Sequence, residues 1–132
     1  MDRKDELVKG WLHRAEHDLG IARLALEHQP EYTDVICFHC QQAVEKLLKA
    51  YLTHRDIPFK RTHSLTYLLD LLDEKEQMSD DLYSMAEELE GYAVEIRYPD
   101  DWQEPTQEEG REAYRIAIAI REVVLGKMAS DE

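Results

Sequence analysis

The sequence predicts an all-α fold, in the form of an up-and-down four-helix bundle with one additional short helix. Apolar residues recur every three or four positions almost throughout the chain, which is the spacing of one face of a helix. Residues that favour helix starts precede several of these segments. No segment alternates apolar and polar residues as a strand would, and the connecting segments are short, which favours antiparallel helices in a bundle.

The first two helices are expected on either side of Pro30. Proline is tolerated only in the first turn of a helix, so Pro30 ends the first helix or starts the next element. Asp34 is expected to be the N-cap of a second helix that runs to about His54. This second helix is apolar on more than one face, a pattern typical of the central helix of a bundle. The apolar face of the first helix is formed by Val8, Trp11, Ala15, Leu19, Ala22 and Leu26.

The third and fourth helices are also preceded by capping residues. Thr62 or Ser64 is expected to cap a short, leucine-rich helix. Ser79 is expected to open a fourth helix whose apolar positions continue to Ile96. The segment 97–105 contains two prolines and is expected to break that helix.

Thr106 and Glu109 have the spacing of a capping box, which predicts the start of the last helix. Its apolar pattern stops near Gly126, where the helix is expected to end. A chain of 132 residues is the usual size of one domain and is long enough to bury a core. We therefore expect residues 1–132 to form a single helical domain.

The composition is that of a globular protein, with 43% hydrophobic and 34% charged residues. No apolar run is long enough to span a bilayer, and the N-terminal residues do not resemble a signal peptide. Two cysteines are too few for a disulfide framework. These features predict a cytoplasmic protein that does not bind membranes.

The net charge of −13 is concentrated in one part of the chain. Between residues 70 and 109 there are fifteen acidic residues and two basic ones, whereas the rest of the chain is neutral overall. This acidity argues against DNA binding, because binding to phosphate backbones depends on many Lys and Arg contacts. Residues 46–63 carry five basic residues and one acidic one, so a single small basic site is expected there.

Two groups of residues resemble metal sites. His13 and His17 have the spacing of a zinc-binding pair, but no third ligand is evident from the sequence. Cys37, His39 and Cys40 form a second group, which likewise lacks the four ligands of a structural zinc site. Cys40 falls on an apolar face of its helix and is expected in the core. We therefore expect no metal and no cofactor.

Three segments are more distinctive than the rest of the sequence. They are FHCQQAVEKLLKAYL (38–52), KRTHSLTYLL (60–69) and VEIRYPDDW (94–102). In this order, and following WLHRAEHDLGIARLAL, they resemble the small prokaryotic members of the HEPN family over nearly the whole chain. The resemblance implies a four-helix bundle with a fifth helix, commonly as a homodimer. It also implies nucleotide binding and a frequent pairing with a minimal nucleotidyltransferase as toxin and antitoxin.

Active relatives of this kind are metal-independent ribonucleases that pair an arginine with a histidine at the dimer interface, with four to six residues between the two. This sequence departs from that motif. Arg97 is followed by no histidine at that spacing, and seven residues separate Arg55 from His63. The resemblance therefore implies the fold, the pairing and nucleotide binding, and not cleavage by the family's route.

The preferred hypothesis is a protein that binds nucleotides or RNA ends as the partner of a nucleotidyltransferase. The expected ligand-binding residues are Lys49, Arg61, His63, Arg97 and Tyr98. Cationic side chains at helix ends or in loops hold phosphates by charge-assisted hydrogen bonds, and a tyrosine ring can stack on a base.

Other interpretations stay open at this stage. Lys49 and Glu45 have the spacing of a surface ion pair on one helix. The chain could be a ribonuclease in which Arg97 and His63 form a non-standard catalytic pair, with histidine as the acid–base group and arginine stabilising the charged transition state. It could also be an interaction module whose acidic face holds a basic partner, without any ligand.

Overall fold

The structure is a computed structural model that describes residues 2–93 and 103–130. This part of the chain contains five α-helices and one short 3-10 helix, and no strand. The elements are α1 (Arg3–His28), α2 (Thr33–His54), α3 (Leu65–Asp73), α4 (Asp80–Glu90), η1 (Gly91–Ala93) and α5 (Gln107–Ser130). The predicted all-α class and the presence of five helices are confirmed.

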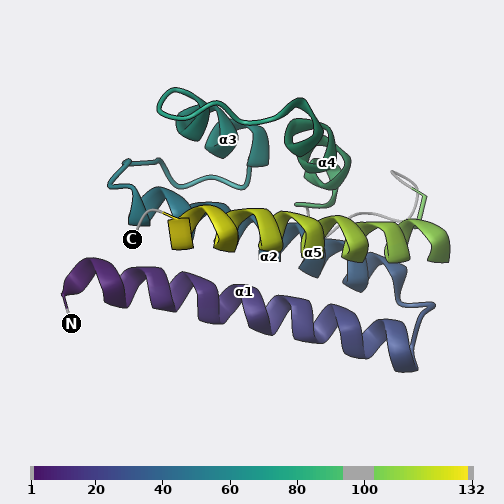
Figure 1. Ribbon diagram of the computed structural model, residues 1–132. Helices are drawn as coiled ribbons and strands as arrows, with labels where there is room; N and C mark the ends of the chain where they lie inside the picture. The colour runs from purple at the N-terminus through teal and green to yellow at the C-terminus, as the bar shows by residue number, and fades with distance from the viewer. Residues whose placement is uncertain (1, 94–102, 131–132) are drawn as a thin grey trace.

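The helix α2 lies at the centre of the molecule. It runs antiparallel to α1, while α5 lies in front of it in this view, and the shorter helices α3 and α4 form a layer on top (Figure 1). The helix α5 contacts both α1 and α2. Only α2 contacts every other helix of the described chain. Its buried residues include apolar side chains on several faces, such as Ile36, Val44, Leu47, Leu48 and Leu52. The central position predicted for this helix is therefore confirmed.

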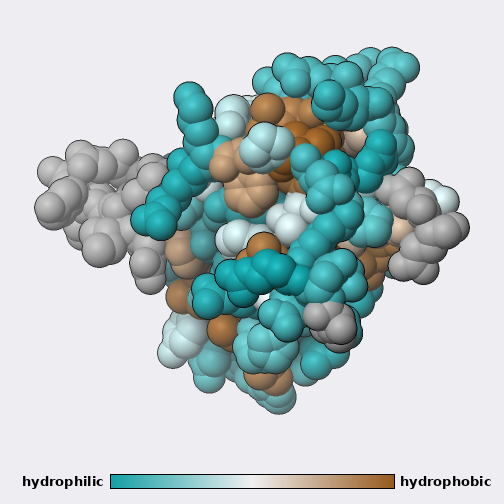
Figure 2. All heavy atoms as spheres, turned by 90° about the vertical axis from the view of Figure 1, so that its left-hand side faces the viewer, coloured by the Kyte–Doolittle hydropathy of each residue, from teal (hydrophilic) through white to brown (hydrophobic). Residues whose placement is uncertain are grey.

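Hydrophilic side chains cover most of the end of the molecule where α1 begins and α5 finishes, with apolar side chains visible in smaller groups between them (Figure 2). The buried apolar side chains form one core that includes residues from all five helices. Removing their apolar area from water is the main favourable contribution to folding. None of the helices in the described residues is both long and apolar enough to cross a bilayer.

Three of the predicted helix starts are confirmed by side-chain hydrogen bonds. The hydroxyl of Ser64 accepts a hydrogen bond from the backbone N–H of Tyr67 at 3.2 Å, and that of Ser79 accepts one from Leu82 at 3.1 Å. Thr106 and Glu109 form the capping box, because each side chain accepts a hydrogen bond from the backbone N–H of the other.

The prediction that Asp34 caps α2 is wrong. The helix begins at Thr33, and its N-cap residue is Tyr32, whose side chain makes no capping hydrogen bond. Asp34 lies in the first turn instead. A carboxylate there still interacts favourably with the positive end of the helix dipole, which explains why an acidic residue marks this helix start without capping it.

Two helix ends also differ from the sequence-based prediction. The helix α4 ends at Glu90, and Gly91, a weak helix former, begins the 3-10 helix. Ile96, the last apolar position predicted for this helix, lies outside the described residues. In contrast, α5 continues past Gly126 to Ser130. The last turn is held by tertiary contacts, because Met128 is buried and the ammonium of Lys127 lies 3.0 Å from a carboxylate oxygen of Glu76 on the α3–α4 connection.

Candidate functional site

A buried ion pair lies on the side of α2 that faces the loop before α3. The side chains of Glu45 and Lys49 are only 4% and 7% exposed. The ammonium of Lys49 lies 2.9 Å from Oε2 of Glu45 and donates a second hydrogen bond to the backbone carbonyl of Thr62 at 2.9 Å. Glu45 and Lys49 are four residues apart on the helix, which is the spacing of the surface ion pair considered from the sequence. Both side chains are buried, however, so the pair does not lie on the surface. Its charges therefore depend on each other far more than those of a surface pair.

His63 is attached to this ion pair. Its Nδ1 atom lies 2.9 Å from Oε1 of Glu45, while 68% of its side chain is exposed. An ionised carboxylate can only accept a hydrogen bond, so Nδ1 is the donor and Nε2 is the second ring nitrogen. Nε2 makes no hydrogen bond or ion pair within the described residues. The side-chain amide of Gln41 fixes the backbone of the histidine by donating to its carbonyl at 3.0 Å.

The loop that carries His63 is also tied to α4. Oε1 of Glu90 accepts hydrogen bonds from the hydroxyl of Ser64 at 2.8 Å and from the backbone N–H of Thr66 at 3.2 Å. Oε2 of Glu90 accepts one from the hydroxyl of Thr66 at 3.0 Å. The histidine is thus positioned by α2 on one side and by the α3–α4 layer on the other.

Two half-buried aromatic rings lie beside the ammonium of Lys49. The ammonium of Lys49 lies 5.4 Å from the ring centroid of Trp11 and 6.0 Å from that of Phe59. Both distances allow an attraction between the cation and the ring faces. Lys49 is therefore enclosed by the carboxylate, a carbonyl oxygen and two aromatic rings. It is placed to hold Glu45 and not to reach a ligand in the solvent.

The structure brings together two of the five predicted ligand-binding residues. Lys49 and His63 contact opposite oxygens of Glu45, a residue that the sequence had suggested only as half of a surface pair. Arg61 is exposed, two residues before His63 in the same loop, and makes no hydrogen bond or ion pair within the described residues. Arg97 and Tyr98 lie outside the described residues.

A second group of polar side chains joins α1 to α2. Oδ1 of Asp18 lies 2.8 Å from Nδ1 of His39, and Oδ2 lies 2.6 Å from the ammonium of Lys46. Burial by itself raises the pKa of Asp18, but the hydrogen bonds from His39 and Lys46 outweigh it, so the pKa lies below the usual range. Asp18 is thus an ionised carboxylate between two nitrogen groups. No local pattern in the sequence indicates this pairing, because 21 residues separate its acid from the histidine.

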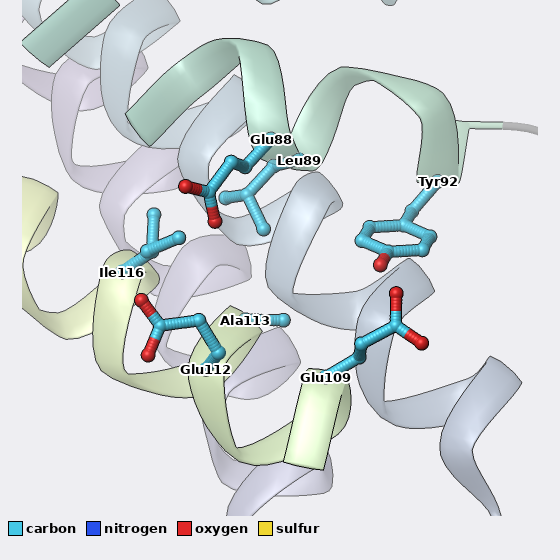
Figure 3. A pocket seen from close by; sticks show the side chains of 7 residues that line it. All are labelled: Glu88, Leu89, Tyr92, Glu109, Glu112, Ala113 and Ile116. Atoms are coloured by element: carbon cyan, nitrogen blue, oxygen red, sulfur yellow. The ribbon is translucent and has the colours of Figure 1, made fainter. Parts of the chain in front are cut away.

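An acidic pocket of about 180 Å³ lies between α4, η1 and α5. In Figure 3 the carboxylates of Glu88 and Glu112 face each other, and that of Glu109 lies below the hydroxyl of Tyr92. Burial, followed by the charges of neighbouring groups, raises the pKa of Tyr92 to about 12. The pocket belongs to the acidic part of the sequence and would favour a cationic group, but carboxylates alone do not select one ligand.

Neither cysteine has the properties of a nucleophile. Both are buried, and burial raises the pKa of Cys37 to about 11 and that of Cys40 further still. The prediction that Cys40 lies in the core is confirmed. His13 and His17 are exposed, with ring centroids 4.2 Å apart. No group of three or more potential metal ligands occurs in the described part of the chain.

Comparison with known proteins identifies the family. The family model of the HEPN domain matches residues 8–127. The chain belongs to the HEPN family. A protein of Methanocaldococcus jannaschii with the name putative toxin MJ1304 is 30% identical to this HEPN protein over an alignment of 131 residues. The alignment covers 89% of this chain and 85% of the relative.

Two crystal structures have the same fold. One is ST0689, an archaeal HEPN homologue, with 31% identity, a TM-score of 0.75 and coverage of 97% of this chain and 99% of that one. The other is TT1696 from Thermus thermophilus, with 31% identity, a TM-score of 0.79 and coverage of 91% and 97%. The HEPN fold that the sequence resemblance implied is thereby confirmed.

Proposed function

We propose that this HEPN protein binds the phosphate group of a nucleotide or of an RNA end through His63 and Arg61. We further propose that it acts as the partner of a minimal nucleotidyltransferase in a toxin–antitoxin pair. The observation that carries the binding proposal is the contact of an exposed histidine with a buried carboxylate. Glu45 fixes Nδ1 of His63 at 2.9 Å and leaves the rest of the ring exposed.

The chemistry of this arrangement suits an anion. A protonated imidazole donates hydrogen bonds from both ring nitrogens, and Nδ1 of His63 is already directed at Glu45. Nε2 of His63 can then donate to a phosphate oxygen. Arg61 stands two residues away and can add a bidentate contact to the same phosphate. Arg97 and Tyr98 remain part of the proposal, as a second cationic group and as a ring that stacks on a base.

The binding proposal predicts a specific effect of replacing His63 with asparagine. The amide of asparagine can still donate to Glu45, but it has no group in the place of Nε2. We expect His63→Asn and Arg61→Gln each to weaken the binding of uridine 5′-monophosphate about ten- to a hundredfold, because a charge-assisted contact contributes about 1.5–3 kcal/mol. The dissociation constant would be measured by NMR titration, which extends to weak ligands.

Two exposed residues supply matched controls. His28, at the far end of α1, has a side chain that is 71% exposed, and Lys75 is exposed in the connection between α3 and α4. His28→Asn and Lys75→Gln are expected to leave the affinity unchanged. Unchanged affinity in His63→Asn, with the fold intact by circular dichroism, would contradict the proposal, and so would a wild-type protein that does not bind the nucleotide.

The ribonuclease alternative is favoured by the same contact. A histidine whose Nδ1 is held by a carboxylate is the arrangement used for general acid–base catalysis, because the carboxylate orients the ring and stabilises its charged form. The two functions differ in their response to His63→Asn. If the protein cleaves RNA, this change should abolish cleavage with a smaller effect on binding, whereas a binding protein should show no cleavage before or after it.

The toxin part of the proposal is supported by one relative. The name of one relative describes it as a putative toxin. We propose that the chain forms a symmetric homodimer, since closed twofold pairing is the commonest assembly of soluble proteins. Light scattering at tens of micromolar should give twice the 15.5 kDa mass of the chain.

Co-expression with a minimal nucleotidyltransferase encoded beside it should give a complex that survives gel filtration. A monomer that forms no such complex would contradict this proposal.

A further inference from the structure

The contacts of His39 repeat those of His63. In both cases Nδ1 of the histidine contacts one oxygen of a carboxylate that is less than 10% exposed, at 2.8 Å from Asp18 and at 2.9 Å from Glu45. In both cases the other oxygen of that carboxylate contacts a lysine ammonium. The molecule therefore contains two Lys–acid–His triads, Lys49–Glu45–His63 and Lys46–Asp18–His39.

The two triads adjoin each other through Gln42 on α2. His39, Gln42 and Lys46 are three and four residues apart, so they lie on the same face of the helix. The amide of Gln42 donates to Gln41 at 2.8 Å and lies 3.4 Å from Oε1 of Glu45, the oxygen that holds His63. The side chain of Gln42 thus links the face that carries the second triad to the first triad.

The charges of both triads are equivalent. Each contains one lysine, one carboxylate and one histidine, so each carries a net charge of +1 when its imidazole is protonated. Asp18 remains ionised because its two hydrogen-bond partners hold its pKa below the usual range. Both triads lie outside the acidic segment 70–109, in the part of the chain that is neutral overall.

The second triad is open to solvent on its basic side. The side chains of His39 and Lys46 are 24% and 19% exposed, whereas that of Asp18 is 9% exposed. Within the described residues Nε2 of His39 makes no hydrogen bond. His39 and Lys46 are therefore partly accessible to an anion from solvent, whereas the carboxylate of Asp18 is largely covered.

We propose that the Lys46–Asp18–His39 triad is a second phosphate-binding subsite, which takes a further phosphate of the ligand bound at His63. This inference rests on the proposed function and extends it, because it requires a ligand with at least two phosphate groups. A single RNA strand and a nucleoside triphosphate both meet this requirement. A nucleoside monophosphate has one phosphate and cannot occupy both subsites.

The test compares three probes: uridine 5′-monophosphate, uridine 5′-triphosphate and a 5′-phosphorylated tetrauridylate. Replacing His39 with asparagine preserves a donor toward Asp18 and removes Nε2. We expect His39→Asn to weaken binding of the triphosphate or of the tetrauridylate about tenfold or more, according to which of them spans both subsites. Binding of the monophosphate at His63, followed by the NMR signals of that ring, should change less than about twofold.

A glutamine variant separates a binding role from a structural one. The amide of glutamine reaches the place of Nε2, so His39→Gln should recover part of the lost affinity, and this recovery is not expected if His39 only stabilises the helix pair. If the wild type and His39→Asn bind each of the three probes with the same affinity, the second subsite is refuted. If His63→Asn also leaves the affinity unchanged, the proposed function is refuted together with the second subsite. If only His63→Asn lowers the affinity, the proposed function stands and only the second subsite is refuted.

Discussion

Replacing Lys49 with alanine is expected to lower the free energy of unfolding by about 3–5 kcal/mol. This cost arises because Glu45, with a side chain only 4% exposed, would keep a buried negative charge without its lysine partner. The change also removes the cation beside the rings of Trp11 and Phe59. Urea denaturation followed by circular dichroism would measure the effect.

Two further variants distinguish this explanation from a general effect of losing a lysine. Lys75 is exposed, so Lys75→Ala should change the stability by less than about 0.5 kcal/mol. The double variant Glu45→Leu with Lys49→Met removes both charges and should recover most of the stability, since a buried ion pair is often replaced by apolar residues at little cost. It should nevertheless lose affinity for phosphate, because His63 then lacks its carboxylate. A Lys49→Ala protein as stable as the wild type would refute the buried ion pair.

The second large effect is expected from replacing Asp18 with asparagine, which should lower the free energy of unfolding by about 2–3 kcal/mol at neutral pH. The neutral amide removes the charge of the carboxylate and has one acceptor oxygen, so it can accept a hydrogen bond from only one of His39 and Lys46 at a largely buried position. Chemical denaturation at neutral pH would measure this difference. Asp34→Asn, at an exposed position in the first turn of α2, should cost less than about 1 kcal/mol.

The same pair of proteins makes a prediction about pH. The pKa of Asp18 is lower in the folded protein than its usual value, so its ionised form stabilises the fold above the pKa of the unfolded chain. That stabilisation is lost as the pH falls through the lower pKa of the folded state. The difference between wild type and Asp18→Asn should therefore shrink as the pH falls below about 4. A difference that does not depend on pH in the acid range would contradict the ionised state of Asp18.

Local signals in the sequence predicted most of the fold. The capping residues Ser64, Ser79 and Thr106 act within one turn of the helix that they start, so a few adjacent residues are sufficient to identify them. The ends of α4 and α5 were predicted less well. The last turn of α5 persists beyond Gly126 because its side chains contact the α3–α4 connection, and such contacts outweigh the weak helix preference of one glycine.

The candidate site was predicted only in part. The sequence indicated a basic region in residues 46–63 and suggested Lys49 and His63 within it. It did not indicate that Glu45 would contact both, nor that Asp18 would form the same arrangement with His39 and Lys46. The partners of Asp18 lie on another helix, and His63 lies in the loop that follows α2. Periodicity along the chain does not predict which basic residues such packing brings to an acid.

The all-α class, the central place of the second helix and the HEPN family all follow from the sequence, because each depends on spacing and order along the chain. Which charges are buried depends instead on tertiary packing. Packing of the loop 55–64 against α2 encloses Lys49 with Glu45 and leaves His63 exposed, while packing of α1 brings Asp18 between two basic residues of α2. A charge acquires a large energetic effect only when neighbouring elements remove it from water, and those neighbours are distant in the sequence.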